Sequence, residues 1–329
     1  MRSKWQGFKS PIGIHIERFL AYRRALGQQF RVEEYSLRLL DQFLTGADIQ
    51  NAHDLTPDLL DSFMASRPRS SPRSYNHLLG VTRRLLDWMV KQQTLPCSPL
   101  KARPRRQTAE RIPFLFNPHQ FRRLLELASG LPDNPRAPDR GTTYRTIFVL
   151  LYGLGLRIGE VCRLCLKDID VERQLLVIRQ SKFAKSRLVP FGPRIAIQLQ
   201  DYIGIREQRW GKLEADEPVF SFSRNRFINP GTVSQTFRKL FPLLNFELSA
   251  GVSPARLHDL RHAFAVNTLL HWYQTGINPS DKLLYLSTFM GHVNPNSTAV
   301  YLTITEALFQ EANTRFENFA NFINREENQ

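Results

Sequence analysis

The feature that most constrains the fold is an abrupt change in residue pattern about a third of the way along the chain. Before residue 96, apolar residues recur at intervals of three and four, the spacing of amphipathic helices. Residues 96–112 then bring three prolines, a cluster of basic side chains and few apolar residues. Beyond them the pattern mixes helical stretches with short β-rich runs. This order predicts two domains joined by an exposed basic linker.

The N-terminal part is expected to form a small all-α bundle of four or five helices. Two amphipathic stretches end at Gly27 and Gly46, and glycine commonly follows the last turn of a helix. A third begins at Thr56-Pro57, which suits an N-cap residue followed by proline in the first turn. The predicted domain covers residues 1–95.

The C-terminal part, residues 113–329, is predicted to be mixed. Helical spacing dominates, including a run over residues 157–166 (RIGEVCRLCL). Two runs rich in β-branched and apolar residues, 175–180 and 186–191, predict a β-hairpin with lysines at its turn. A short VFSF run at 219–222 suggests an edge strand. The expected fold class is mainly α with a small β-sheet.

Charge indicates a polyanionic partner. Lysine and arginine number 45 against 30 acidic residues, a formal net charge of +15. Such a charge favours nucleic acid, although a basic solvated surface is the alternative. No apolar run is long enough to cross a membrane, and the N-terminus lacks a signal-peptide core, so a cytoplasmic protein is expected.

The three cysteines do not predict a disulfide framework. Cys162 and Cys165 form a C-x-x-C pair, which zinc or redox chemistry would use. Both residues lie in an apolar-patterned run, and no second C-x-x-C or Cys/His pair follows. Packing is therefore the favoured interpretation.

Two arginines and two histidines stand in short motifs: Arg157 in GLRIGE, His258 and Arg261 in HDLRH, and His292 after Gly291. Gly291 is expected to end the preceding helix and to leave His292 at a turn. A phosphoryl-transfer transition state gathers negative charge on its non-bridging oxygens, and a guanidinium group can donate to two of them at once. Imidazoles can donate to the phosphate or move the nucleophile's proton. The set predicts a site for one phosphate.

A lysine and a tyrosine would complete this site. Lys182, at the tip of the predicted hairpin, could act as the general acid that protonates a leaving 5′-oxygen. The alternative is an ordinary solvated lysine in a turn. Tyr301 follows His292 by nine residues and suits the nucleophile. Its segment contains Asn294-Pro295, so a mobile tyrosine is expected. Tyr285 lies in a helical apolar run and is expected to pack in the core.

These motifs, in this order, resemble those of the tyrosine recombinase family, the phage-type integrases, and look most similar to the bacterial Xer-like branch. The segment LYGLGLRIGEVCRLCLKDID is similar to the region of the family's first arginine, SKFAKSRLVPFG to the lysine hairpin, and HDLRHAF to the H-x-x-R box. The resemblance covers roughly residues 112–315. It implies the catalytic residues Arg157, Lys182, His258, Arg261, His292 and Tyr301, with Glu160 and His262 as supports beside them.

The resemblance also implies how such a protein acts. Family members form a helical core-binding domain and a mixed catalytic domain that clamp double-stranded DNA at a specific recombination site. Four protomers, of one kind or with a related recombinase, join two duplexes. The tyrosine forms a 3′-phosphotyrosine, and strands exchange through a Holliday junction without metal or nucleotide cofactor. The basic residues expected to contact DNA are Lys101, Arg103, Arg105, Arg106 and Lys185.

The segment between the H-x-x-R and G-H boxes departs from the family pattern, with an insertion near residues 272–282, and the tail after Tyr301 is long. Both features favour integration, excision or movement of a mobile element over chromosome-dimer resolution. The tail is expected to dock either on a neighbouring protomer or on its own domain. Other readings are a type IB topoisomerase-like enzyme, a metal-dependent nuclease and a non-catalytic DNA-binding protein.

Overall fold

The computed structural model describes residues 7–106, 112–179, 186–248, 252–292, 294, 296–299 and 301. The chain divides into two compact units, Met1–Glu110 (unit 1) and Arg111–Gln329 (unit 2). No helix among the described residues is long and apolar enough to span a bilayer.

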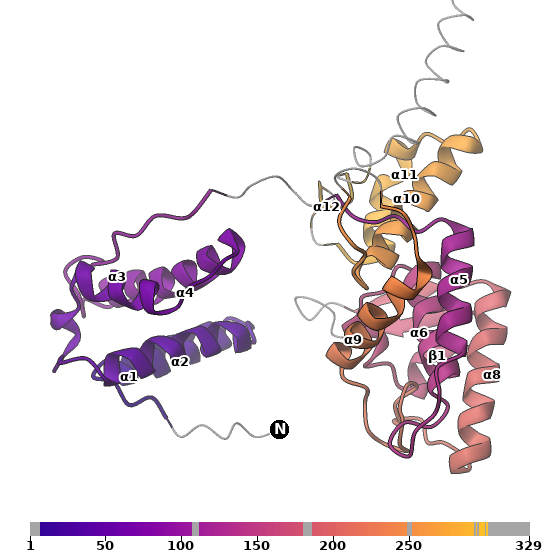
Figure 1. Cartoon of the computed structure of the whole chain (residues 1–329), viewed down its shortest axis with the longest axis horizontal. Helices are drawn as coiled ribbons and strands as arrows, with labels where there is room; N and C mark the ends of the chain where they lie inside the picture. The colour runs from indigo at the N-terminus through magenta and orange to yellow at the C-terminus, as the bar shows by residue number, and fades with distance from the viewer. Residues whose placement is uncertain are drawn as a thin grey trace, which may run out of the picture. The chain divides into compact units, whose positions relative to one another are not determined.

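Unit 1 is a helical bundle (Figure 1). Its described elements are α1 (Gly13–Ala25), α2 (Arg31–Thr45), the short 3-10 helix η1 (Ala52–Asp54), α3 (Pro57–Ser66) and α4 (Pro72–Lys91). Helix α4 contacts both α1 and α2, which lie side by side. Apolar residues at helical spacing meet between them, and Ile16, Leu40 and Leu85 are fully buried.

The predicted ends of the unit 1 helices are confirmed. The Thr56 hydroxyl accepts a hydrogen bond from the Leu59 backbone N–H (3.2 Å), and Pro57 begins α3. Helix α2 ends at Gly46, and Gly27, just beyond α1, has the left-handed backbone (φ +76°) that favours glycine.

The segment expected as an exposed linker belongs in part to unit 1. Leu100 is 7% exposed and packs in the core of the bundle. The Asn76 side chain on α4 bonds both backbone groups of Arg105, accepting from its N–H (2.7 Å) and donating to its C=O (2.8 Å). An apolar residue at position 100 and a matched amide on α4 hold this stretch against unit 1, which corrects the expectation of a free connector. Residues 107–111 of the expected linker lie outside the described part.

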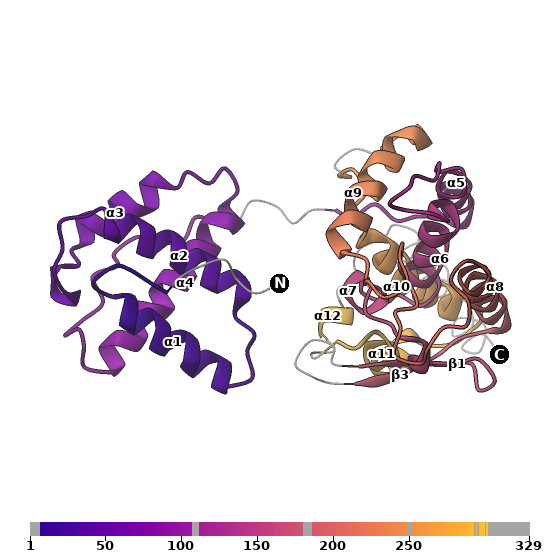
Figure 2. The same cartoon turned by 90° about the horizontal axis from the view of Figure 1, so that it is seen from below.

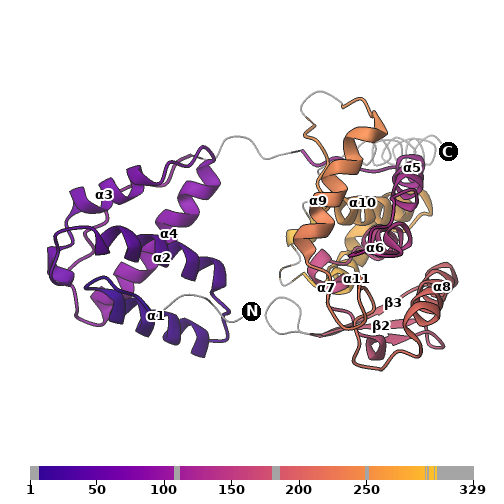
Figure 3. The same cartoon turned by 60° about the horizontal axis from the view of Figure 1, so that its bottom comes forward.

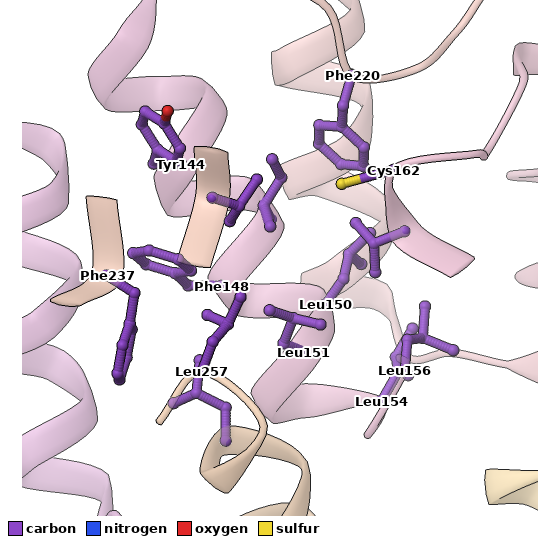
Figure 4. Close-up of a cluster of buried hydrophobic side chains, with 14 of the residues drawn as sticks. Tyr144, Phe148, Leu150, Leu151, Leu154, Leu156, Cys162, Phe220, Phe237 and Leu257 are labelled. Carbon is purple, nitrogen blue, oxygen red and sulfur yellow. The ribbon is translucent and has the colours of Figure 1, made fainter. Parts of the chain in front are cut away.

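Unit 2 is built around α6, which contacts α5, α8 and α10. Its described helices are α5 (Pro118–Ser129), α6 (Arg140–Gly153), α7 (Ile158–Val161), η2 (Leu166–Asp168), α8 (Pro193–Trp210), α9 (Pro230–Leu240), η4 (Phe241–Leu244), α10 (Asp259–Gln274), α11 (Pro279–Met290) and α12 (Asn296–Ala299). Figure 4 shows Phe148 and Leu151 of α6 within a cluster of buried apolar side chains.

A three-stranded antiparallel sheet confirms the pairing of the two predicted strands, while the predicted lysine turn, residues 180–185, lies outside the described residues. The strands β1 (Ile169–Asp170), β2 (Leu175–Ile178) and β3 (Arg187–Pro190) lie in the order β1-β2-β3. Leu176 pairs with Val189, and both are fully buried. Leu188, the residue before Val189 on β3, points to the other face and is 60% exposed. Helix α8 lies beside β2 and β3 (Figure 3), and α11 contacts β3 (Figure 2). The sheet therefore has one face in the core.

Two expected elements differ in the structure. The helix predicted over residues 157–166 is the short α7, because the chain turns after it to enter η2. The run 219–222 is no strand: Val219 and Phe220 are both buried, which an alternating edge strand does not allow, and only the preceding Pro218 makes a bridge, to Cys165. The fold class as a whole, mainly helical with a small sheet, is confirmed.

Tyr285 was expected in the core and is instead 67% exposed. The buried face of α11 carries Leu286 and Met290, four residues apart, and Tyr285 projects from a different side of the helix. Its ring lies under the ammonium group of Lys282, 5.2 Å from the ring centre.

Candidate active site

The first turn of α10 holds three of the candidate side chains. His258 is the N-cap residue just before the helix, Arg261 lies one turn along, and His262 follows it. Because residues four apart share a face, the rings of His258 and His262 meet edge to face with their centres 4.7 Å apart. Arg261 is 2% exposed, so its guanidinium group lies inside the protein.

The C-terminal end of α11 is held by three arginines. Gly291 adopts the left-handed conformation (φ +68°), and the backbone N–H groups of Gly291 and His292 close the helix on Thr288 (3.0 Å) and Ser287 (2.9 Å). This confirms that the glycine ends the helix and places His292 in a turn. Three successive carbonyls then accept one arginine each: Phe289 from Arg187 (2.8 Å), Met290 from Arg261 (2.8 Å) and Gly291 from Arg157 (2.7 Å).

Glu160 joins two of these arginines. One carboxylate oxygen accepts from Arg157 (2.8 Å), and Arg187 donates to both oxygens (3.0 and 2.9 Å). Burial by itself raises the pKa of Glu160, but the hydrogen bonds and charges of Arg187 and Arg157 outweigh it and lower that pKa to about 2. The carboxylate therefore stays ionised and fixes both guanidinium groups. Arg261 donates to the Gly155 carbonyl as well.

Sequence reasoning missed Arg187. It lies at the start of β3, and its side chain is 10% exposed. The signal was present in the run K-x-x-K-x-R-x-V-P, in which this arginine has a fixed place before the buried Val189. Its position ties the base of the hairpin to the end of α11.

Tyr301 lies beside both histidine motifs. Its ring centre is 5.4 Å from that of His262 and 6.4 Å from that of His292. The phenol oxygen lies 2.9 Å from Nδ1 of His262, while Nδ1 of His292 lies 2.7 Å from the Thr298 hydroxyl on α12. Tyr301 is 4% exposed and makes a specific contact in this structure, and its expected mobility stays a prediction.

Burial and positive charge set the protonation states of the site. Burial, followed by neighbouring His262 and Arg261, lowers the pKa of His258 to about 4. Burial and the charges of Arg261 and Arg157 likewise lower the pKa of His292 to about 4. Both imidazoles are therefore neutral at pH 7. Burial and the nearby Arg157 lower the pKa of Arg261 to about 9, which leaves it charged at neutral pH.

The same forces act in opposite directions on the nucleophile candidate. Burial raises the pKa of Tyr301 above its usual value, and the charges of Arg261 and Arg157 partly offset that rise. A phenol held this way keeps its proton at neutral pH, so a proton acceptor is needed for it to attack.

A cleft of about 770 Å³ opens beside the site. Its wall includes His258, Ile158 of α7, Arg238 of α9 and Arg256 before α10. Two basic side chains and one candidate catalytic side chain thus line one concave surface, the rest of which is mostly apolar.

The remaining predicted site residues are placed as follows. Lys182 and Lys185 lie outside the described residues. Lys101, Arg103, Arg105 and Arg106 are exposed on unit 1. Arg105 is engaged there, donating to the Arg69 carbonyl (2.8 Å) and lying over the Tyr75 ring.

Within the described part of unit 2, neither the carboxylates nor the cysteines gather as a metal site. Asp168 accepts from Arg179 (2.6 Å) and from the Cys165 backbone N–H (3.0 Å). Burial raises the pKa of the Cys162 thiol to about 12, so this side chain is an inert part of the core. Across the described ranges, no three His, Cys, Asp or Glu side chains gather as metal ligands would.

Comparison with known proteins defines the class. Residues 116–307 match the phage integrase family, and the chain belongs to that family. A protein of Sinorhizobium fredii, named as the integrase/recombinase y4rB, is 32% identical over 307 residues, covering 92% of this chain and 96% of its own. The tyrosine recombinase XerC of Proteus mirabilis is 27% identical, covering 88% and 89%. The chain is thus a tyrosine site-specific recombinase.

Solved structures agree on the fold. A lambda integrase dimer bound to a core site superposes with a TM-score of 0.62 at 14% identity, covering 88% of this chain and 76% of that one. The XerH recombinase bound to its difH substrate superposes with a TM-score of 0.61 at 15% identity, covering 95% and 99%.

Proposed function

We propose that this recombinase cuts and rejoins DNA through a 3′-phosphotyrosine formed by Tyr301. The observation that carries the proposal is the place of the phenol: its oxygen is 2.9 Å from an imidazole nitrogen and within the field of Arg157 and Arg261. A phenol among fixed cations suits attack on a phosphodiester, because the same cations stabilise the charge that develops on the phosphate.

The proposed reaction uses the fixed arginines as an oxyanion clamp. Glu160 and the carbonyls at the end of α11 hold the guanidinium groups of Arg157 and Arg261, so little reorganisation accompanies phosphate binding. The Tyr301 oxygen forms a bond to phosphorus, and the bond from phosphorus to the 5′-oxygen breaks. That oxygen leaves as a hydroxyl after taking a proton, for which Lys182 is the proposed donor. Neutral His258 and His292 donate to the phosphate oxygens.

The proposed partner is double-stranded DNA carrying a specific site. Support comes from the net charge of +15 and from exposed Lys101, Arg103 and Arg106 on unit 1, which suit phosphate contacts, together with Arg105 and Lys185. A lambda integrase tetramer bound to a Holliday junction is among the structures similar in fold (TM-score 0.61, 14% identity). A homotetramer on two duplexes is the assembly we propose. Metal and nucleotide are not part of the proposed chemistry.

The proposed biological role is integration, excision or movement of a mobile element, with chromosome-dimer resolution as the alternative. The relative named integrase/recombinase favours the first, and the Xer-named relatives favour the second. Recombination assays between inverted repeats flanking the coding region and between direct chromosomal repeats would separate the two.

A nicked suicide substrate tests the chemistry. When cleavage releases a short 5′-hydroxyl strand that diffuses away, the wild-type protein should accumulate a denaturant-resistant protein–DNA adduct. Tyr301→Phe should form none, and Tyr285→Phe, which alters an exposed tyrosine on α11, should match the wild type. An adduct on the Tyr301→Phe protein would overturn the assignment of the nucleophile.

A further inference from the structure

His262 and Tyr301 make a specific polar contact in addition to being packed together. Nδ1 of His262 faces the phenol oxygen at 2.9 Å, which is hydrogen-bonding distance. On the other side of the ring, Nε2 lies 4.0 Å from Oδ1 of Asp259, one helical turn back on α10. Asp259 is 1% exposed, and its other carboxylate oxygen accepts from the Arg256 backbone N–H (2.9 Å). The carboxylate is therefore fixed in place.

These three groups form a series of carboxylate, imidazole and hydroxyl, separated by 4.0 Å and 2.9 Å. This is the order in which a nucleophile, its base and a group that orients the base are arranged in covalent catalysis. We propose that His262 accepts the Tyr301 proton during strand cleavage and that Asp259 orients and stabilises the resulting imidazolium. This inference rests on the proposed phosphotyrosine chemistry.

The step balances as follows. The phenol proton moves to Nδ1 of His262 as the bond from the Tyr301 oxygen to phosphorus forms and the bond to the 5′-oxygen breaks. For Nδ1 to accept, the neutral ring must carry its proton on Nε2, the nitrogen that faces Asp259. The imidazolium then has a proton on each nitrogen, one directed at the tyrosyl oxygen and one toward the carboxylate. In the rejoining reaction the proton returns from Nδ1 to the phenolate as it leaves phosphorus.

Other imidazoles of the site are less suited to this task. His292 directs Nδ1 at the Thr298 hydroxyl (2.7 Å), and its ring centre is farther from that of Tyr301 than the ring centre of His262 is. His258 meets His262 edge to face rather than the phenol. The charged and titratable groups around His262 and its tyrosine come from three parts of unit 2: Asp259, His258 and Arg261 around α10, Arg157 before α7, and His292 after α11.

Single-turnover cleavage of the suicide substrate, measured from pH 5.5 to 9.5, tests the proposal. With His262 as proton acceptor, the wild-type rate falls as acid protonates the imidazole and levels off at higher pH. His262→Ala should be slower by roughly 100-fold or more at pH 7, the usual contribution of a general base. Its deficit should shrink as the pH rises, because solvent hydroxide then takes the proton, and added imidazole should restore part of the rate.

A second variant separates proton transfer from positioning. In His262→Asn the amide can accept the phenol hydrogen bond but cannot take its proton. This variant should remain as slow as His262→Ala, and His271→Ala, at an exposed histidine in the last turn of α10, should cleave like the wild type. Full activity with a wild-type pH profile in His262→Asn would overturn the inference.

A substrate with sulfur in place of the bridging 5′-oxygen gives an independent readout. A thiolate leaves without a proton, so this substrate bypasses the general acid and not the base. His262→Ala should stay impaired on it, whereas Lys182→Ala should recover. Recovery of the cleavage rate in His262→Ala would mean that His262 protonates the leaving group, and this would refute the proposal. If the wild-type protein forms no adduct on any substrate, the phosphotyrosine proposal itself fails, which is a distinct outcome.

Discussion

The end of α11 in unit 2 is held differently from the helix ends of unit 1. In unit 1, α2 ends at Gly46, and α4 ends with the Gln92 N–H bonded to the Trp88 carbonyl, one turn back. In unit 2, α11 also closes locally at Gly291, but arginines from β3, α10 and the start of α7 add a bond each to its last carbonyls. One of them, Arg157, lies 134 positions before the glycine it contacts.

The difference shows which residues fix the position of each helix end. A helix in unit 1 needs its own apolar stripe and a cap within a few residues. The turn that carries His292 needs arginines from distant elements, and two of them, Arg157 and Arg187, are themselves held by the buried Glu160. Cations at a helix C-terminus also complement its dipole. The end of α11 is therefore a junction at which three elements of the proposed site are fixed together.

Arg261→Lys should break this junction most severely. A lysine cannot donate in a fork to Gly155, Met290 and a phosphate together, so we expect single-turnover cleavage to fall roughly 1000-fold, as when a transition-state donor is lost. DNA binding, measured by gel shift, should change less than threefold. Arg209→Lys, in an exposed pair with Asp139, is the matched control. Cleavage within tenfold of wild type would contradict the proposed role.

Glu160→Gln should destabilise unit 2 strongly. Removing the buried carboxylate leaves two part-buried arginines without their shared anion, and breaking a buried pair typically costs about 3–5 kcal/mol. Hydrogen exchange of the buried α6 amides would report this loss in the full chain. Glu126→Gln, in an exposed pair with Arg123, should change the free energy of unfolding by under about 0.5 kcal/mol. Equal effects of the two substitutions would refute the comparison.

Acid should weaken unit 2 through the same carboxylate. The folded-state pKa of Glu160, about 2, lies below its ordinary value of 4.5, so the unfolded chain binds the proton first as the pH falls. The stabilisation is fully present above about pH 4.5 and is lost toward pH 2, with a size of about 3 kcal/mol. The gap in unfolding free energy between wild type and Glu160→Gln should therefore narrow in acid. A gap that stays constant from pH 6 to pH 2.5 would disprove this linkage.

The same contrast explains what sequence predicts. Caps such as Thr56 and Gly291 and the antiparallel pairing of β2 with β3 are local patterns, and all were predicted correctly. Burial of Tyr285 was predicted wrongly because an apolar run does not by itself say which side of a helix meets the core. The Arg187–Glu160 pair and the His262–Tyr301 contact join residues 27 and 39 positions apart, so no local spacing reveals them.

Gly291→Ala should have an intermediate effect. A left-handed residue with a Cβ costs about 1–2 kcal/mol, and here the added carbon would also lie 2.7 Å from a guanidinium nitrogen of Arg187. Gly276→Ala, after α10, has the same backbone cost (φ +84°) with nothing within 4 Å. Any greater loss of stability and of cleavage in Gly291→Ala than in Gly276→Ala then measures the effect of displacing Arg187. Identical losses in the two variants would mean that the Arg187 side chain can move aside without a cost to stability or cleavage.

Thr56→Ala in unit 1 should have the smallest effect and so sets the lower end of the comparison. It removes one hydrogen bond to the Leu59 N–H at the start of α3, a cap that usually contributes about 1 kcal/mol. Because the contact is local, exchange of α3 amides should rise while α10 and α11 are unchanged, and cleavage by DNA-bound protein should match the wild type. A loss of cleavage rate at saturating DNA would mean that unit 1 acts on the chemistry as well as on binding. The distinction between locally and remotely fixed helix ends would then no longer separate residues that only stabilise a unit from residues that support cleavage.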